Sequence, residues 1–372
     1  MRVFYFITKS ECGGAQSVIW ELLSAHKKNG DEVIVMASTS GWLADETKAF
    51  GFSFIPNRFI QKTLNPILIL RALFVYRNAV LEFKPDIVSL HSSFSGFIGR
   101  IGLLNRYPVV YTAHGWGFIN GVSLPKKIIA IVAEKIAAYF CKKIICVSVF
   151  DQQIALSYAI AKKEKINVIH NGVTIPSNIT RKHENKKLRI VFLGRFAEPK
   201  RQDLLIAAFA RLPQALQAKV EVRLLGNGPK KSKLNTQILA LHVEKSIYIT
   251  ETLDRAKALA ELSEGDILVL VSDWEGFPMV ILEALQLSIP VIANNVGGMS
   301  EAIDAPVGAL LPAQVTSEDI ALALIELISN DDFRHQKGIK AKERGMQYTG
   351  EIMSREVFAL YVSILKSYAR KV

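Results

Sequence analysis

Two glutamates, Glu275 and Glu283, flank a predicted strand-to-helix corner and have the residue types and spacing for ligand binding. The apolar run 266–271 is typical of a buried parallel strand, and Pro278 is predicted at the first position of the following helix. The free amides and positive dipole of a helix start favour phosphate, whereas a carboxylate with two acceptor oxygens suits a vicinal diol. The corner therefore predicts a ligand that carries both phosphate and hydroxyl groups.

The alternative for either carboxylate is an ordinary solvated position, which is the commoner place for an isolated glutamate. Glu283 departs from it because its neighbours in 281–285 are apolar, so the helix is too apolar to lie at the surface. A buried carboxylate needs a partner. We therefore predict that Glu283 accepts hydrogen bonds from the diol, and that Glu275 in the loop reaches another part of the ligand.

Two cations, Arg195 and Lys200, follow a second predicted strand, 189–194, and surround the start of a predicted helix. They are predicted to lie together at the carboxyl edge of a parallel sheet, where such folds bind their ligands. There they can stabilise negative charge that develops on a leaving phosphate. Alone, an Arg and a Lys around a helix start would be unremarkable surface charges.

The first half of the chain offers glycines and a histidine at strand ends. Gly13 and Gly14 follow the first predicted strand and would let the backbone approach a phosphate closely. A third, correctly spaced glycine is missing, which counts against the dinucleotide fingerprint of a dehydrogenase. A lone histidine is more often structural, but His114 stands at the carboxyl end of strand 109–113 and is predicted to contact the ligand. His91 ends another strand and is the weaker candidate.

Short apolar strands alternate with helical stretches along the chain, which predicts parallel sheets and an α/β fold. With 372 residues the chain exceeds what one core usually serves, so two domains are predicted. The charged segment 174–187 is predicted to link a domain of residues 1–173 to one of residues 188–350, and 351–372 is predicted as a long C-terminal helix. The predicted strands are 3–8, 32–37, 86–91, 109–114, 143–149, 189–194, 221–226, 247–250, 266–271 and 291–294.

Cysteine usage and hydropathy indicate the compartment. Cys12, Cys141 and Cys146 show neither a metal-ligand spacing nor a disulfide framework, which is typical of a reducing cytosol. The apolar start breaks at Lys9 and is too short for a secretory signal. No uninterrupted apolar run approaches the roughly 18 residues of a membrane span. We therefore predict a cytoplasmic protein that does not cross a bilayer.

Basic residues are concentrated in the first half of the chain. Residues 1–185 contain 22 Lys and Arg against 12 Asp and Glu, whereas residues 186–372 contain 24 against 22. Segments 58–77 and 124–143 mix cations with apolar residues and are predicted to contact an anionic membrane, at about 1 kcal/mol per basic residue. Ordinary helices with charged outer faces are the alternative, and nucleic acid is a weaker one because no reader motif occurs. The cations concerned are Arg58, Lys62, Arg71, Arg77, Lys126, Lys127, Lys135, Lys142 and Lys143.

Six short motifs, in one order along the chain, resemble those of a known family. They are GGAQ (13–16), TAHG (112–115), VIHNGV (168–173), LGRFAEPKRQDLLIAAFA (193–210), LLGNGP (224–229), and the Glu275 and Glu283 spacing followed by PVIANNVGG and Glu301. Together they resemble the family-4 retaining glycosyltransferases of the GT-B fold, of the kind that builds bacterial surface polysaccharides. No single motif is decisive, but their joint order covers nearly the whole chain.

The resemblance implies a fold and a set of site residues. The fold would be two Rossmann-like lobes whose parallel sheets face a central cleft, with the C-terminal helix crossing back to the first lobe. Arg201 stands where the family usually has Gly, so the loop around Lys200 is expected to differ in shape. The implied catalytic residues are His114, Arg195, Lys200 and Glu275. The implied donor-binding residues are Gly13, Gly14, Gly194, Gly226, Asn227, Gly276, Phe277, Pro278, Met279, Val280 and Glu283.

The implied reaction transfers a hexose or N-acetylhexosamine from a nucleoside-diphosphate sugar, by default a UDP-sugar, to a lipid-linked or glycan acceptor with retained configuration. No Asp-x-Asp follows a strand, so we predict no metal site and no cofactor. The predicted partners are the donor, a lipid-linked sugar acceptor and the anionic inner face of the plasma membrane, where the protein would be peripheral. The alternatives are a nucleotide-sugar epimerase or hydrolase, a transferase with a soluble acceptor, and a non-catalytic binding protein.

Overall fold

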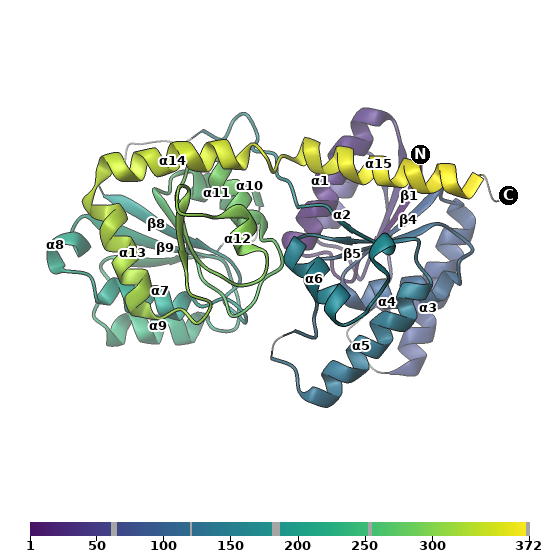
Figure 1. Cartoon of the computed structure of the whole chain (residues 1–372), viewed down its shortest axis with the longest axis horizontal. Helices are drawn as coiled ribbons and strands as arrows, with labels where there is room; N and C mark the ends of the chain where they lie inside the picture. Colours follow the sequence, from purple (N-terminus) through teal and green to yellow (C-terminus); the bar gives the residue numbers. More distant parts are fainter. Residues whose placement is uncertain (61–64, 120, 181–186, 252–254, 370–372) are drawn as a thin grey trace. The chain divides into compact units, whose positions relative to one another are not determined.

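The computed structural model describes residues 1–60, 65–119, 121–180, 187–251 and 255–369. Two compact units divide the chain: unit 1 is Met1–Gly172 with Gly350–Val372, and unit 2 is Val173–Thr349. Each unit contains one parallel sheet with helices on its faces (Figure 1). Lys62 and part of the predicted linker, 181–186, lie outside the described residues.

Unit 1 contains a seven-stranded parallel sheet in the order β3-β2-β1-β4-β5-β6-β7. Its strands are β1 (Arg2–Phe6), β2 (Glu32–Ala37), β3 (Ser53–Pro56), β4 (Ile87–His91), β5 (Val109–Ala113), β6 (Lys143–Cys146) and β7 (Ile166–Val168). Its helices are α1 (Gly14–Asn29), α2 (Trp42–Ala49), α3 (Pro66–Phe83), α4 (Ser93–Leu103), α5 (Leu124–Tyr139), α6 (Val149–Ser157), the 3₁₀ turn η1 (Lys163–Lys165) and the C-terminal α15 (Gly350–Ala369).

Unit 2 contains a six-stranded parallel sheet in the order β10-β9-β8-β11-β12-β13. Its strands are β8 (Leu188–Leu193), β9 (Val220–Leu225), β10 (Ile247–Thr250), β11 (Ile267–Leu270), β12 (Val291–Asn294) and β13 (Gly308–Leu311). Its helices are α7 (Gln202–Ala210), α8 (Gln214–Gln217), α9 (Lys231–Ala240), α10 (Arg255–Ser263), α11 (Met279–Gln286), α12 (Met299–Ala302), α13 (Ser317–Ser329) and α14 (Asp331–Gly345).

The two faces of the unit 1 sheet bury different kinds of side chain, because successive strand residues point to opposite sides. Phe4 and Phe6 of β1 join the apolar core that α3, α4 and α5 cover. Tyr5 points to the other face, where it contacts His26 of α1 with ring centroids 5.7 Å apart. Helix α15 closes that face, since the ring of Phe358 lies 4.4 Å from the ring of His26. Two parallel α/β units, with the C-terminal helix on the first, confirm the predicted fold class.

Three strands, β3, β7 and β13, are missing from the sequence prediction. Each lies at the edge of its sheet. An edge strand pairs on one side only, so it does not need the continuous apolar run that marks a buried strand. β3, for example, has no fully buried residue. Within the described ranges, every helix is too short or too polar to span a membrane.

In both sheets the strand order reverses beside the first strand of the unit. β1 lies between β2 and β4, and β8 lies between β9 and β11. Loops that leave the carboxyl ends of such neighbouring strands turn to opposite faces, and the crevice between them is where α/β sheets bind ligands. The residues after β1, β4, β8 and β11 are therefore the candidates for a site.

Candidate functional site

Three loops meet at the carboxyl edge of the unit 2 sheet: 194–201 after β8, 226–230 after β9 and 271–278 after β11. Backbone hydrogen bonds tie them together. The Phe196 amide donates to the Asn227 carbonyl at 2.9 Å, and the Asp273 amide donates to the Pro199 carbonyl at 2.9 Å. These bonds hold the three loops as one cluster, which positions the side chains that the loops carry.

Lys200 and Glu275 form an ion pair within this loop cluster. The Lys200 ammonium donates to Glu275 Oε1, and the two side chains are 15% and 13% exposed. A backbone bridge joins Lys200 to Ser272, so the lysine is held beside the loop that carries the glutamate. An anionic ligand that enters here competes with Glu275 for the ammonium. Lys200 is therefore a partly buried cation whose partner, Glu275, can be displaced by an anionic ligand.

Arg195 lies at the end of β8 and is exposed. Its side chain makes no ion pair with any described residue, while its backbone carbonyl accepts from Gln202 Nε2 at 3.0 Å. Arg201, where the resembled family usually has Gly, instead pairs with Asp203 at 2.9 Å and with Asp273 at 3.2 Å. The structure thus separates Arg201, which braces the loop through two aspartates, from Arg195 and Lys200, the other two cations of loop 194–201.

Glycine lets the first two loops approach each other. Gly226 has φ +148°, and a Cβ there would lie 2.2 Å from the Gly194 carbonyl oxygen. A Cβ on Gly194 would lie 3.3 Å from Lys200 Cε, so the lysine stem passes close to this residue. Asn227 is exposed, and its Oδ1 accepts from the next backbone amide at 2.7 Å. These predicted donor-binding residues shape the loop cluster through their backbone.

Two residues absent from the predicted site brace the loop that carries Glu275. Asn294 at the end of β12 accepts from the Ser272 amide at 3.0 Å and donates to the Ser272 carbonyl at 2.8 Å. Gly297 has φ +59°, and a Cβ there would lie 2.0 Å from the Glu275 carbonyl oxygen. Both residues belong to the motif PVIANNVGG, whose bracing role follows only from the structure.

Glu283 is buried on α11 and pairs with Arg255, the first residue of α10. Glu283 Oε1 and Arg255 Nη1 are 2.8 Å apart, and the side chains are 7% and 12% exposed. The pair satisfies part of the buried carboxylate and fixes its direction. No local pattern in the sequence links these two helices, so Arg255 is absent from the predicted site.

The start of α11 differs from the prediction by one residue. Pro278 occupies the N-cap with ψ 127°, outside the helix rather than at its first position. Proline fixes only φ, and its φ of −73° suits both positions, so the loop geometry decides. The other predicted residues of this stretch are buried or half-buried: Gly276, Phe277, Met279 and Val280.

At the carboxyl edge of the unit 1 sheet, Gly13 precedes α1 and Gly14 begins it. Gly13 is half-buried and Gly14 is exposed, so backbone is accessible at this turn. Thr8, between β1 and the glycines, shares a hydrogen bond with Ser92 through their hydroxyls at 2.8 Å. The loops after β1 and β4 are thus joined by neutral polar groups, a contact that the sequence did not indicate.

His114 follows β5 and contacts His91, the last residue of β4. Nε2 of His114 and Nδ1 of His91 are 2.9 Å apart, and the rings stack with centroids 5.2 Å apart. Burial lowers the pKa of His114 to about 4. Burial, with a smaller effect of His114, also holds the pKa of His91 well below its usual range. Both rings are therefore neutral near pH 7, and each can donate and accept one hydrogen bond.

A hydrogen-bonded chain leads from this histidine pair to α15. The Tyr361 hydroxyl donates to Ser89 Oγ at 2.8 Å, and Ser89 Oγ lies 3.1 Å from His91 Nε2. With Tyr361 donating to Ser89, the serine hydroxyl donates to His91 Nε2, and His91 Nδ1–H donates to His114 Nε2. This order leaves His114 Nδ1–H to donate to a ligand. The buried and half-buried groups at the carboxyl edge of unit 1 therefore form a neutral hydrogen-bonded network, whereas the Lys9 and Glu11 ion pair of the loop after β1 is exposed.

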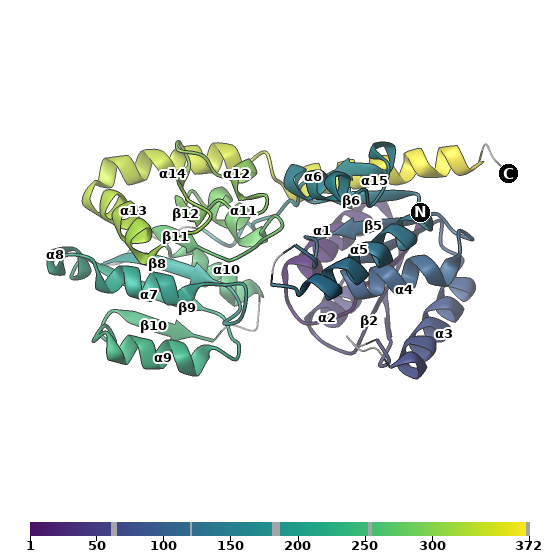
Figure 2. The same ribbon diagram turned by 60° about the horizontal axis from the view of Figure 1, so that its bottom comes forward.

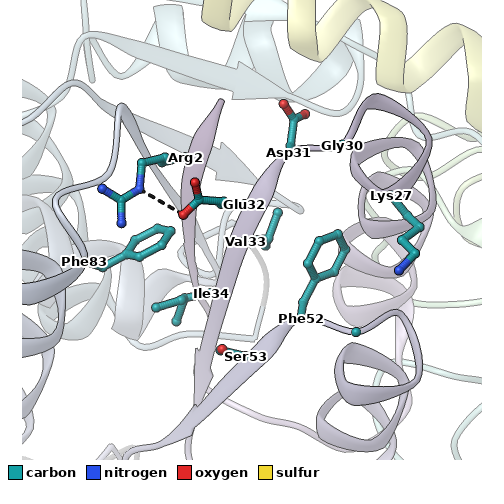
Figure 3. Close-up of a pocket in the computed structure, with 11 residues that line it drawn as sticks. Arg2, Lys27, Gly30, Asp31, Glu32, Val33, Ile34, Phe52, Ser53 and Phe83 are labelled. Carbon is teal, nitrogen blue, oxygen red and sulfur yellow. Dashed lines mark ion pairs between the residues drawn. The ribbon is translucent and has the colours of Figure 1, made fainter.

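A pocket of about 510 Å³ opens at the opposite, amino edge of the unit 1 sheet (Figure 3). The starts of β1, β2 and β3 form its walls. Arg2 Nε lies 3.2 Å from Glu32 Oε2, and the Arg2 guanidinium lies 4.7 Å from the centre of the Phe83 ring. No predicted site residue is among the described residues that line it. Because parallel sheets bind ligands beyond their carboxyl ends, we assign this pocket no part in the chemistry.

Potential metal ligands are scattered in this fold. Among the described residues, no group of three or more His, Cys, Asp or Glu side chains is placed to hold a metal ion. The positive charge at the candidate site comes from Arg195 and Lys200. Metal-independent catalysis stays a prediction.

Two parallel-sheet units, one with a cationic carboxyl edge, define an α/β protein suited to a phosphorylated ligand. The model "Glycosyltransferase Family 4" matches residues 12–175, and the model "Glycosyl transferases group 1" matches residues 177–344. The chain belongs to the group 1 glycosyl transferases, with an N-terminal half of the family 4 type. This confirms the family resemblance that the six motifs indicated.

The chain is similar to curated relatives and to solved structures, in two of the following three cases over nearly its whole length. The O-antigen biosynthesis glycosyltransferase WbnH of Escherichia coli is 27% identical over 365 residues, which cover 98% of this chain and 99% of that protein. An Escherichia coli UDP-Gal:alpha-D-GlcNAc-diphosphoundecaprenol alpha-1,3-galactosyltransferase is 27% identical over 273 residues, 69% of this chain and 68% of that one. Anabaena Alr3699/HepE, solved with UDP and glucose, superimposes with a TM-score of 0.81 at 19% identity, over 98% of this chain and 100% of that chain.

Proposed function

We propose that this chain is a retaining glycosyltransferase that moves a hexose or N-acetylhexosamine from a UDP-sugar to a lipid-linked acceptor in the synthesis of a bacterial surface polysaccharide. The observation that carries the proposal is the Lys200 and Glu275 ion pair beside exposed Arg195, at the switch point of the unit 2 sheet. Two cations at that position suit a diphosphate. The resemblance to an O-antigen biosynthesis glycosyltransferase supports the choice of pathway class.

Donor recognition uses groups of unit 2. The diphosphate takes the place of Glu275 at Lys200 and recruits Arg195. Glu283, oriented through its Oε1 by Arg255, accepts hydrogen bonds from the vicinal hydroxyls of the ribose with its other oxygen. A UDP donor is supported by the likeness to a fold neighbour that was solved with UDP.

The chemistry follows from where charge develops. Breaking the bond between the anomeric carbon and the phosphate oxygen puts negative charge on the diphosphate and positive charge on the sugar ring. Lys200 and Arg195 stabilise the negative charge on the diphosphate. Because this charge grows in the transition state, the stabilisation lowers the barrier more than it tightens substrate binding. The acceptor hydroxyl attacks the anomeric carbon on the face that the diphosphate leaves, and its proton passes to the departing phosphate oxygen. Configuration is then retained without a metal ion.

The acceptor is proposed to be a sugar on a polyprenyl diphosphate. The name of one relative specifies such an acceptor, which supports the same class here. The neutral donors and acceptors at the carboxyl edge of unit 1, among them His114, suit sugar hydroxyls, which carry no charge. A lipid-linked acceptor requires the enzyme to work at the inner face of the plasma membrane, so we propose a peripheral location there.

The test is release of nucleoside diphosphate from a panel of nucleotide sugars in the presence of a chelator, with and without a polyprenyl-diphosphate-sugar acceptor. We expect release from one UDP-sugar that depends on the acceptor and continues in the chelator. Glu275, once displaced from Lys200, is the carboxylate proposed to face the positive charge on the sugar ring, so Glu275→Gln should abolish most of the release. Asp273→Asn, on the same loop but paired with Arg201, should keep most of it.

Three other outcomes would contradict the proposal. Equal release without acceptor would identify a hydrolase or epimerase. Transfer to a water-soluble sugar in preference to the lipid-linked one would place the enzyme away from the membrane. Loss of release in chelator, restored by a divalent ion, would overturn metal independence. Anomeric configuration in the isolated product, read from its proton coupling constants, tests retention directly.

A further inference from the structure

Helix α5 carries its large apolar side chains on the outside of unit 1. Ile129 is 68% exposed and Tyr139 is 73% exposed. The buried residues of the helix are Glu134, Ala137 and Ala138, so its inner face is small and partly polar. The exposed apolar residues of α5 are Leu124, Ile128, Ile129, Val132, Ile136 and Tyr139. Apolar patches of this kind mark surfaces that bind another apolar partner.

The exposed residues of α5 form one stripe. Leu124, Ile128, Val132 and Ile136 recur every fourth position, and residues at that spacing lie above one another on a helix. The stripe runs along the whole helix and opposes the inner face. Helix α5 is therefore apolar on its solvent side, where a helix of a globular protein is normally polar.

A buried ion pair holds α5 in this orientation. Glu134 Oε2 accepts from Arg100 Nη2 of α4 at 2.7 Å, and the Arg100 guanidinium lies 4.0 Å from the centre of the Tyr111 ring. A charge buried at that contact would be costly without its partner, so rotation of the helix to hide its apolar stripe is opposed. The stripe is a stable surface of the folded unit.

Helices α3 and α4 continue the apolar surface. α4 lies beside both α3 and α5 (Figure 2). In the first half of α3 the exposed large apolar residues are Ile67, Leu70 and Phe74. The half-buried ones of α4 are Phe94, Phe97 and Ile101, of which Phe94 and Phe97 also pack against the core. We call these six residues, with the six of α5, the apolar face.

The charge around the apolar face is mainly positive, although α3 carries one exposed carboxylate, Glu82, near its C-terminal end. Residues 87–133, which include α4 and most of α5, contain no Asp or Glu. The carboxylate of Glu134 is buried against Arg100. Exposed cations lie on or beside the helices of the face: Arg71, Arg106, Lys126 and Lys135. An apolar surface fringed by cations complements the head groups and acyl region of an anionic bilayer.

We infer that the apolar face inserts into the interfacial layer of an anionic lipid bilayer and is the surface by which this protein docks to the membrane. The inference rests on the proposed function in one respect: the lipid-linked acceptor explains why the protein would dock to a membrane. The exposed side chains and charges that support docking do not depend on that acceptor. Insertion of α5 side chains makes docking resistant to salt, unlike adsorption by lysines alone.

A second copy of the chain is the main competing occupant. A twofold contact through this face would set four exposed cations against the same cations of the other copy, with Glu82 as the one exposed carboxylate on α3, α4 and α5 to offset them. A bilayer with anionic head groups instead neutralises them. Charge complementarity therefore favours lipid.

Flotation on vesicles tests the inference without any acceptor lipid. The wild-type protein is expected to float with phosphatidylethanolamine–phosphatidylglycerol vesicles at about 0.1 M salt and to remain largely bound at about 1 M salt. Ile129→Glu with Val132→Glu should lower the bound fraction at least about tenfold, since two inserted side chains are lost. Lys126→Gln with Lys135→Gln should reduce the preference for phosphatidylglycerol over phosphatidylcholine.

The matched control places the same change on unit 2. Leu239 and Leu322 are exposed apolar residues of α9 and α13, and Leu239→Glu with Leu322→Glu should float like the wild type. Because all of these positions are exposed, each variant should keep the wild-type thermal midpoint, which confirms folding.

Three results would overturn the inference. The first is that the wild type floats with no vesicle. The second is that the variant with Ile129→Glu and Val132→Glu floats as well as the wild type. The third is that the wild type is a dimer in sedimentation velocity, that this variant is a monomer, and that neither protein binds vesicles. The last result would assign the face to a second copy. If flotation behaves as expected but no sugar transfer is found, the docking surface stands and the proposed function fails.

Discussion

The carboxyl edges of the two sheets have the same topology and opposite chemistry. In unit 2, the loops after β8 and β11 carry a Lys200 and Glu275 ion pair and exposed Arg195. In unit 1, hydroxyls and a pair of neutral histidines join the loops after β1, β4 and β5, and the Lys9 and Glu11 ion pair of the β1 loop is more than half exposed. The largely buried polar groups are therefore charged at the unit 2 edge and neutral at the unit 1 edge.

The difference matches the two kinds of group in a glycosyl transfer. A diphosphate leaving group needs compensating charge where its negative charge grows. Sugar hydroxyls need donors and acceptors but no net charge, and a buried unpaired charge beside them would be costly. In the proposed function, one sheet topology serves both purposes, because the loops and not the strands carry the chemistry.

The largest expected effect is at the charged edge. Lys200→Met should lower the turnover number about a thousandfold, in line with removal of one stabilising group at a developing charge. The measurement is the transfer rate at saturating donor and acceptor. Lys230→Met is the matched control, since Lys230 pairs with Glu198 at 2.5 Å on a neighbouring loop. An equal loss in both variants would assign the effect to loop structure rather than to charge at the site.

A second variant separates donor binding from chemistry at the same edge. Glu283→Gln should raise the Michaelis constant for the donor about tenfold with little change in turnover, since ribose contacts are the same in ground and transition states. It also removes the negative charge from a buried ion pair, so the free energy of unfolding should fall by about 3 kcal/mol. Steady-state kinetics and urea denaturation measure the two. Exposed Glu326→Gln should change neither, and a fall in turnover alone would contradict the assignment.

Acid should destabilise unit 1 before unit 2. Burial lowers the pKa of His26, His91 and His114 below the ordinary 6.5, in the case of His114 to about 4. Between the folded-state pKa of each histidine and 6.5, the unfolded state therefore binds more protons than the folded state. Stability is complete above pH 6.5 and falls as the pH drops through that window, by about 1.4 kcal/mol per pH unit for His114 alone.

Hydrogen exchange at about pH 7.5 and about pH 5.5 would locate this loss. Amides of β4 and β5 should lose protection at the lower pH while those of β8 and β11 keep theirs. His114→Gln should reduce the pH dependence. Earlier loss of protection in unit 2 would contradict the contrast between the edges.

The smallest expected effect is in the neutral chain. Burial raises the pKa of Tyr361 to about 12, so its hydroxyl stays protonated and donates to Ser89. Tyr361→Phe should lower turnover about threefold, the value of one modest hydrogen bond. It should also shift the ¹⁵N signals of the His114 ring, which report the tautomer. Tyr368→Phe, on the same helix but bonded weakly to an exposed carbonyl at 3.5 Å, should leave both unchanged.

Much of the architecture could be predicted because the central strands are buried on both faces. The run that forms β11, for instance, is continuously apolar and is bounded by polar loops. Three of the four edge strands, β3, β7 and β13, could not be found this way, since they pair on one side and have mixed burial, whereas the fourth, β10, was predicted.

The candidate site divides in the same manner. Lys200 and Glu275 could be assigned to one edge, because each follows a parallel strand of the same sheet and carboxyl ends share an edge. Their ion pair was not predicted, because it depends on how two loops fold against each other. Arg255 was missed altogether, since nothing local connects α10 to a carboxylate on α11.

By itself, the sequence determined the class of fold, the family and the residues that follow the central strands, because these depend on local periodicity and on motifs in order. Only the tertiary structure decided which charges meet, that His91 holds His114 in a neutral pair, and that α5 turns its apolar side chains outward. The reason is physical. Burial and pairing depend on contacts between residues from distant parts of the chain, so the sequence neighbours of a residue do not determine them.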